Sequence, residues 1–85
     1  MSKLPRLDLR VLRAAVAVRD AGSVTLAARR LGTSQPALSR LIATLEAELG
    51  FALFSRSGRS LTPAPAAELF LSQAAATLVG TERLS

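Results

Sequence analysis

Apolar residues recur every three or four positions in three blocks of this chain, and glycines separate the blocks. The spacing predicts helices at Leu7–Ala21, Val24–Leu31 and Ser34–Leu49, because positions three and four apart share one face of an α-helix. Gly22 and Gly32 follow the first two blocks, and glycine readily adopts the left-handed conformation that ends a helix. The pattern therefore predicts three helices joined by tight turns.

Each of the first two helices is expected to bury one apolar face. The face of the first is broad and comprises Leu9, Val11, Leu12, Ala15, Val16 and Val18. The face of the second comprises Val24, Ala27, Ala28 and Leu31, and its small alanines let another helix approach closely. The hydroxyl of Ser23 is placed to cap this helix, and Thr33 or Ser34 is placed to cap the next one.

The third helix has the sharpest division between an apolar and a polar side. At about 100° per residue, its apolar stripe spans roughly 100° of arc and consists of Leu38, Leu41, Ile42, Leu45 and Leu49. The opposite side carries Pro36, Ser39, Arg40, Ala43 and Ala47. Gln35 lies beside the stripe but in the first turn, where its side chain reaches forward. Pro36 is tolerated there because first-turn amides have no helical partner.

The segment after Gly50 predicts a hairpin and then a fourth helix. Residues Phe51–Thr62 hold two short apolar-polar runs around the turn signal Ser57-Gly58, with strands of two or three residues each. An Ala- and Leu-rich stretch follows and predicts a helix from Pro63 or Pro65 to about Leu78. That helix has a mostly apolar face suited to packing against another surface, and the face consists of Leu69, Phe70, Ala74, Thr77 and Leu78.

Composition narrows the class of protein. The 85 residues make one small domain without cysteine. Its net charge of +5 is concentrated between Lys3 and Arg59, where ten basic and four acidic residues give +6, so the domain attracts polyanions. No uncharged stretch approaches the ~20 residues that span a bilayer, and charges interrupt any signal peptide near the N-terminus. We therefore expect a cytoplasmic protein without membrane contact.

A short helix, a tight turn and a longer helix with a free polar side are typical of helix-turn-helix domains that enter the DNA major groove. Gln35 can pair with adenine, Arg40 with guanine, and Ser39 with either a base edge or a phosphate. Pro36 offers an apolar surface to a thymine methyl group. An enzyme is excluded by the absence of His and Cys, of a Gly-rich phosphate loop and of paired acids at a suitable spacing. No cofactor or metal is expected.

The chain resembles the N-terminal domain of LysR-type transcriptional regulators from about Leu9 to its end. The resemblance rests on the combination of S-Q-P-A-L-S-R with L-E-x-E-L-G and L-F-x-R-x-x-R-x-L-T. The matching residues are Ser23, Ala27, Ala28, Leu31, Ser34-Gln35-Pro36-Ala37-Leu38-Ser39, Ile42, Leu45-Glu46, Leu49-Gly50, Leu53-Phe54, Arg56, Arg59 and Leu61-Thr62-Pro63.

The resemblance implies a mainly α fold, a winged helix-turn-helix over residues 1–62 followed by a linker helix over residues 63–85. It implies sequence-specific binding of double-stranded DNA by a bacterial transcription factor, with Gln35, Pro36, Ser39 and Arg40 as the usual contacts. We add Ser23, Thr25, Arg30, Ser34, Arg56 and Arg59 as further candidates. The linker helix would form a homodimer through Leu69, Phe70, Ala74 and Leu78. A small-molecule effector would bind a further domain that this chain lacks.

Several residues keep a second interpretation. Ser23 and Gln35 are also suited to capping a helix. Ser39 and Arg40 are also suited to a solvated surface, and Arg56 is also suited to a hydrogen bond with the hairpin's own backbone. Arg29 and Arg30 fit phosphate contacts or solvent equally well. The linker residues also suit packing against the domain's own core, and the whole domain suits protein–protein interaction.

Two positions depart from the family. Pro65 stands where the family usually has Gly, so the linker helix is expected to start late. Ala15 stands in place of a bulky aromatic residue, so the first helix is expected to pack more closely or the core to be smaller.

Overall fold

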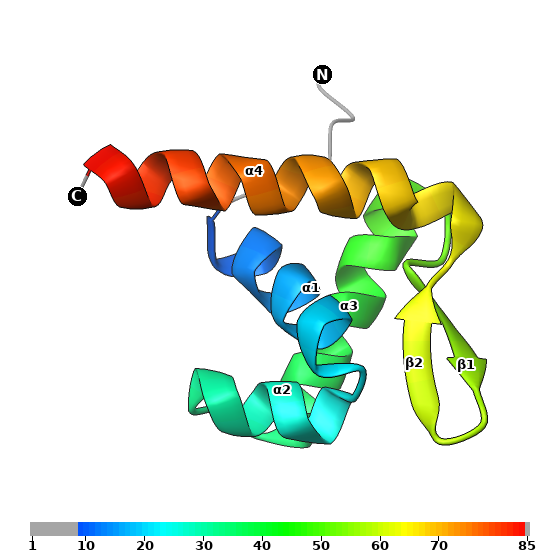
Figure 1. Ribbon diagram of the computed structural model, residues 1–85. Helices are drawn as coiled ribbons and strands as arrows, with labels where there is room; N and C mark the ends of the chain where they lie inside the picture. The colour runs from blue at the N-terminus through cyan, green and yellow to red at the C-terminus, as the bar shows by residue number, and fades with distance from the viewer. Residues whose placement is uncertain (1–8, 85) are drawn as a thin grey trace.

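The computed structural model describes the backbone of residues 9–84 and the side chains of residues 9–80. Within this range four α-helices and one antiparallel hairpin follow one another along the chain (Figure 1). Their bounds are α1 Leu9–Ala21, α2 Val24–Leu31, α3 Gln35–Leu49, β1 Phe54–Ser57, β2 Ser60–Pro63, a 3-10 turn η1 Pro65–Ala67, and α4 Glu68–Leu84. The predicted start of the first helix at Leu7 lies outside the described residues.

The turn between α1 and α2 and the end of α2 are set by two glycines and a serine. Gly22 has φ +67°, and the Ser23 hydroxyl accepts a hydrogen bond from the Leu26 amide at 3.1 Å, as the capping prediction required. Gly32 ends α2 at φ +73°. The Thr33 amide then donates to the Ala28 carbonyl at 2.9 Å. These local bonds fix the angle at which α3 leaves α2.

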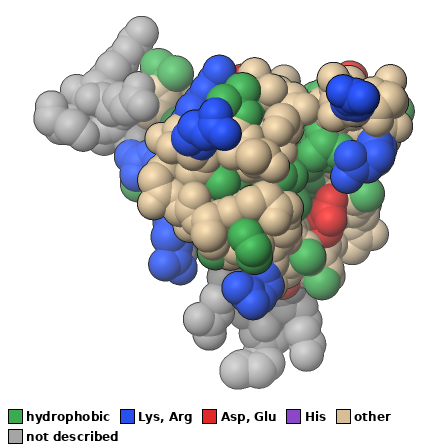
Figure 2. All heavy atoms as spheres, turned by 90° about the horizontal axis from the view of Figure 1, so that it is seen from below, with side chains coloured by type: hydrophobic (Ala, Val, Ile, Leu, Met, Phe, Trp, Pro, Cys, Tyr) green, Lys and Arg blue, Asp and Glu red, His purple; other side chains and the backbone are tan. Residues whose placement is uncertain are grey.

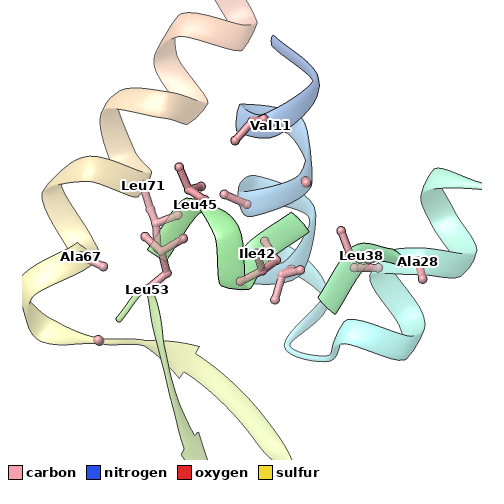
Figure 3. Packing of buried hydrophobic residues seen from close by; sticks show 13 residues of the cluster. Val11, Ala28, Leu38, Ile42, Leu45, Leu53, Ala67 and Leu71 are labelled. Carbon is pink, nitrogen blue, oxygen red and sulfur yellow. The ribbon is translucent and has the colours of Figure 1, made fainter. Parts of the chain in front are cut away.

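The core lies between α1, α2, α3 and the start of α4. The largest fully buried side chains are Val18, Leu38, Leu45, Leu53 and Leu71. Figure 3 shows Leu45, Leu53 and Leu71 meeting where α3, the segment before β1 and α4 converge. Burying a leucine of this kind contributes about 1.5–3 kcal/mol, so α3 is held by its apolar stripe.

Small residues bring the helices close together. Ala15 and Ala27 are 0% exposed and Ala28 is 2% exposed, which confirms that the alanines of α2 lie at a helix crossing. Ala15, at the position where the family tends to place a bulky aromatic residue, is fully buried. The two expected consequences, closer packing of the first helix or a smaller core, stay predictions.

Two leucines differ from the sequence prediction. Leu31 is 40% exposed and Leu9 is 39% exposed, although the helical spacing placed both on inward faces. Leu31 is the last residue of α2, so no following turn of that helix covers its side chain. Leu9 is the first residue of α1. The prediction of burial was therefore wrong for Leu9 and Leu31.

The hairpin is longer than predicted. Its register pairs Phe54 with Pro63 and Ser57 with Ser60, so each strand has four residues rather than two or three. In Figure 1 the hairpin projects on one side of the molecule, and the C-terminal end of α2 lies on the opposite side. The hairpin therefore has the place of a wing beside the helix-turn-helix.

The fourth helix starts late and ends beyond its predicted limit. Pro65 opens a 3-10 turn, and regular α-helix begins at Glu68, as expected from the restriction that proline places on Ala64. The helix then continues to Leu84, past the predicted end near Leu78. Figure 1 shows α4 crossing over α1, which buries Leu71, Ala74 and Leu78 inside the chain.

Candidate nucleic-acid interface

The first turn of α3 is built to expose polar side chains. Ser34 is the N-cap, and its hydroxyl accepts a hydrogen bond from the Ala37 amide at 3.2 Å. Pro36 occupies the first turn, where no amide donor is needed. Both residues are exposed. Because Ser34 caps the helix, Gln35 is not needed as a cap and its side chain is available for another role.

Gln35 and Ser39 act as a pair on this turn. The Gln35 Nε2 donates a hydrogen bond to the Ser39 Oγ at 2.7 Å, across the four-residue spacing that brings side chains together on a helix. This bond orients the amide so that its Oε1, its second Nε2 proton and the Ser39 hydroxyl proton remain for an external partner. The pair therefore presents one acceptor and two donors side by side.

The arginines around this turn are exposed and unpaired with acids. Arg29, Arg30 and Arg40 are exposed, and none has an acidic partner among the described residues. By contrast, Arg19 is bound to Asp20 at 2.9 Å. Figure 2 looks onto the side where α2 and the hairpin tip lie, and it shows basic side chains at several places around that face. The face is therefore suited to a polyanion.

The hairpin tip adds two more arginines to the exposed surface. Gly58 has φ +62° and no other hairpin residue has a positive φ; this two-residue turn, Gly58-Arg59, has the left-handed first position of a type II′ turn. Arg59 thus lies at the tip. Arg56 is in β1 opposite Leu61, and no hydrogen bond joins its side chain to the described backbone. The alternative of a backbone-bonding Arg56 is therefore not observed.

Two hydrogen bonds tie the root of the hairpin to the helical part of the domain, and a third joins the two segments that flank the hairpin itself. The Leu61 amide donates to the Gly22 carbonyl at 3.0 Å, and the Ala64 amide donates to the Leu53 carbonyl at 2.9 Å. The Leu53 amide donates to the Glu46 carboxylate at 2.7 Å. Glu46 is thus a site residue that sequence reasoning missed, because it acts on a buried backbone amide seven positions away and no spacing rule indicates such a bond.

The start of α2 brings Ser23 and Thr25 to the surface near the hairpin root. Thr25 is exposed and Ser23 is half-buried by its capping bond. Arg29 and Arg30 lie in the last turn of the same helix, where positive charge also complements the helix dipole. The predicted contacts of α2 therefore lie at its two ends rather than in one cluster.

The predicted dimer residues of α4 are divided between two sides of the helix. Leu69 is 69% exposed, whereas Ala74 and Leu78 are 4% and 8% exposed because they pack inside the single chain. Phe70 is partly buried against the core. Val79, a further apolar residue of this helix, is 50% exposed. The free apolar surface of α4 is therefore centred on Leu69 and Val79.

Among the helices that the structure describes, none combines the length and the apolar character needed to cross a membrane. The described residues also contain no group of His, Cys, Asp and Glu side chains suited to a metal ion.

Comparisons with known proteins agree with this geometry. The family model described as "Bacterial regulatory helix-turn-helix protein, lysR family" matches residues 9–68. The transcriptional regulator AbaB of Streptomyces antibioticus is 53% identical over 57 residues, which cover 67% of this chain and 19% of that protein. The regulator ClcR of Pseudomonas putida is 41% identical over 76 residues, 89% of this chain and 26% of that protein. Relatives of this kind are named as regulators, a non-enzymatic role.

Solved structures give the same result. A BenM_DBD/benA site 1 DNA complex has a TM-score of 0.86 and 38% identity, covering 92% of this chain and 88% of that one. A CbnR_DBD–DNA complex has a TM-score of 0.81 and 38% identity, covering 91% and 88%. The predicted fold class, a mainly helical winged helix-turn-helix, is thereby confirmed. This chain spans between 19% and 35% of the length of the curated relatives.

Proposed function

This chain belongs to the LysR family of bacterial regulatory helix-turn-helix proteins, and on that premise we propose how its exposed surface reads DNA. Sequence-specific binding of double-stranded DNA by a transcription regulator is supported by the family match and by the DNA complexes of its structural neighbours. The proposal concerns which residues make the contacts, and how two copies of the domain cooperate.

The observation that carries the proposal is the contrast between the two sides of α3. Leu38, Ile42 and Leu45 are buried, which fixes the rotation of the helix. That rotation leaves the bonded pair Gln35 and Ser39 at the first turn on the outside. Arg40 lies beside them, exposed and without an acidic partner among the described residues.

In the proposed complex the N-terminal half of α3 lies in the major groove. Gln35, Ser39 and Arg40 meet base edges, and Pro36 meets a thymine methyl group. Ser34 sits at the first turn close to a phosphate, because helix N-termini favour anions. Ser23, Thr25 and Arg30 on α2 contact the backbone from one side. Arg56 and Arg59 on the hairpin contact the adjacent backbone or minor groove.

We further propose that two copies pair through α4, since one recognition helix binds only one half-site and a two-fold dimer doubles the contact. Leu69 and Val79 supply the exposed apolar surface, with Phe70 at its edge. Ala74 and Leu78, also predicted for the interface, support it from beneath by holding α4 against the body of the chain.

Sedimentation equilibrium at tens of micromolar protein tests the dimer. Leu69→Asp is expected to convert dimer into monomer, because a charge in an apolar interface is costly. Thr44→Asp, which places the same charge on an exposed residue of α3, is the matched control. A wild-type protein that sediments as a monomer contradicts the pairing.

Filter binding with random duplex DNA at low salt tests the function itself. The proposal predicts retention of the DNA and a steep loss of affinity as salt rises. A domain that serves only protein–protein interaction retains no DNA at any salt concentration, and that result would overturn the proposal.

We propose further that the regulator acts in the cytoplasm, where the DNA lies. A small-molecule effector would bind a separate domain, and neither residues 1–62 nor the linker helix would form that site.

A further inference from the structure

An open groove lies on the flank formed by α1, the end of α2 and the first half of α3. Its volume is about 470 Å³, and its floor and walls include Leu31, Ala37, Leu38 and Leu41. In Figure 1 the start of α1 and the end of α2 lie on the side of the molecule away from the hairpin. The groove is therefore separate from the hairpin's share of the DNA surface.

The groove also faces a different direction from the base-reading side of α3. At about 100° per residue, Ala37 and Leu41 lie roughly 150° around the helix from the mean direction of Gln35, Pro36, Ser39 and Arg40. An occupant of the groove consequently leaves those four side chains free. DNA and an occupant can bind the same copy of the domain together.

The lining of the groove is apolar at its floor and basic at its edge. Leu31 keeps 40% of its surface exposed, and Leu41 is only partly buried, so apolar surface is accessible there. Arg10 and Arg13, one turn apart on α1, also line the groove. Both are exposed, and neither has an acidic partner among the described residues.

Three kinds of occupant can be compared by their chemistry. DNA complements the arginines but not the leucines. A second copy of this chain carries a net charge of +5, and two of its few acids are already engaged, Asp20 with Arg19 and Glu46 with the Leu53 amide. An acidic amphipathic segment of another protein complements both features, in the manner of helix-in-groove recognition.

We propose that this groove is a docking site for an acidic amphipathic segment of a different protein. Apolar side chains of the segment contact Leu31 and Leu41, and its carboxylates pair with Arg10 and Arg13. Because the contact lies away from the bases, it gives the DNA-bound domain a surface for a protein partner. The inference rests on the groove alone and holds whether or not the detailed DNA contacts proposed above are correct.

Selection from a peptide library tests whether the groove takes a segment of this chemistry. The full chain is panned against a phage library of random peptides of about twelve residues, long enough for three helical turns. Enriched peptides are synthesised, and their affinities are measured by fluorescence anisotropy with and without duplex DNA. The expected peptides combine Asp or Glu with Leu, Ile or Phe.

Variants locate the binding. Leu31→Asp, and separately the double substitution Arg10→Glu with Arg13→Glu, are expected to weaken the peptides about tenfold or more. The controls are Ala47→Asp, an exposed apolar residue elsewhere on α3, and Arg19→Glu, an arginine on the side of α1 away from Arg10 and Arg13. Each control is expected to change the affinity by no more than roughly twofold. Circular dichroism melting confirms that each variant is folded.

A charge exchange gives the sharpest readout. When the acidic residues of a selected peptide are replaced by lysine, its binding to the wild type is lost, and binding to the doubly substituted Arg10→Glu, Arg13→Glu variant is gained. Failure to enrich any peptide contradicts the proposal. So does enrichment of peptides without acids, equal binding to the groove variants, or loss of binding on Ala47→Asp alone. Competition by duplex DNA would assign the groove to DNA instead.

Discussion

The hydrogen bond between Glu46 and the Leu53 amide joins the recognition helix to the root of the hairpin, and removing it has a predictable cost. Leu53 is 0% exposed, and its amide donates to the Glu46 carboxylate at 2.7 Å. Glu46→Ala leaves this amide without its partner. An unsatisfied buried donor costs about 1–3 kcal/mol, and more when the lost acceptor was charged. We therefore expect the free energy of unfolding to fall by about 2 kcal/mol.

This loss is large for a domain of this size, whose total stability is expected to be about 4–13 kcal/mol. Urea denaturation followed by helical circular dichroism measures it, since the chain has no Trp or Tyr for fluorescence. With a slope of about 1–3 kcal/mol per molar urea, the midpoint falls by roughly 1 M. All variants are compared at one protein concentration, because pairing of chains also stabilises the fold.

Two further variants separate the hydrogen bond from other effects. Glu46→Gln keeps a side-chain acceptor of the same length, so it is expected to lose about 1 kcal/mol or less. Thr44→Ala changes an exposed residue on the same helix and is expected to stay within about 0.5 kcal/mol of the wild type. If Glu46→Ala is as stable as the wild type, or Glu46→Gln is as damaging as Glu46→Ala, the hydrogen bond does not hold the hairpin in place.

Three other predictions concern DNA binding and backbone strain. Arg40→Ala is expected to weaken specific DNA binding by roughly 1–3 kcal/mol in an equilibrium titration. The control Arg19→Ala removes an arginine that is paired with Asp20 and is expected to have little effect. Equal losses on specific and random DNA would limit Arg40 to phosphate contact. Arg59→Ala is expected to weaken binding to all sequences and to reduce the slope of log K against log salt by about 1, and an unchanged slope would remove the hairpin tip from the interface. Gly22→Ala is expected to cost about 1–2 kcal/mol of stability because φ is +67° there. The added methyl group has ordinary space, 3.7 Å from the Leu61 carbonyl oxygen, so the cost comes from the backbone conformation. A neutral result in urea denaturation would contradict this backbone strain.

Local chemistry made much of this fold predictable from the sequence. The bounds of α2 were predicted without error, and α3 starts one residue after its predicted start because Ser34 is the cap rather than the first helical residue. Helical spacing, serine caps and glycine ends are all properties of a few adjacent residues. They survive folding because the core of this domain uses the same faces that the spacing defines.

Features that depend on distant segments were not predictable in the same way. The spacing on α4 placed Ala74 and Leu78 on a face that packs against another surface. Only the position of α4 over α1 shows that this surface belongs to the same chain. Leu31 belongs to an apolar face by spacing, yet it stays 40% exposed because none of the described segments covers the end of α2. Glu46 binds a backbone amide of another segment, and side-chain patterns carry no information about backbone donors.

The candidate site was predictable to the extent that it lies on one helix. Gln35, Pro36, Ser39 and Arg40 follow from the stripe that faces the core, because the remaining residues of α3 must face outward. The hydrogen bond between Gln35 and Ser39 was not foreseen, although their four-residue spacing permits it. Their roles as DNA contacts remain predictions.

The most direct measurement is the base preference of the protein, determined by selecting bound sequences from a random duplex pool. We predict a defined motif for the wild type. Because Gln35 and Ser39 act as a bonded pair, Gln35→Ala and Ser39→Ala should each relax the preference at the same base pair and leave the rest of the motif intact. If both variants return the wild-type motif, with affinity lowered equally for every sequence, α3 does not read bases through this turn and the central claim is wrong.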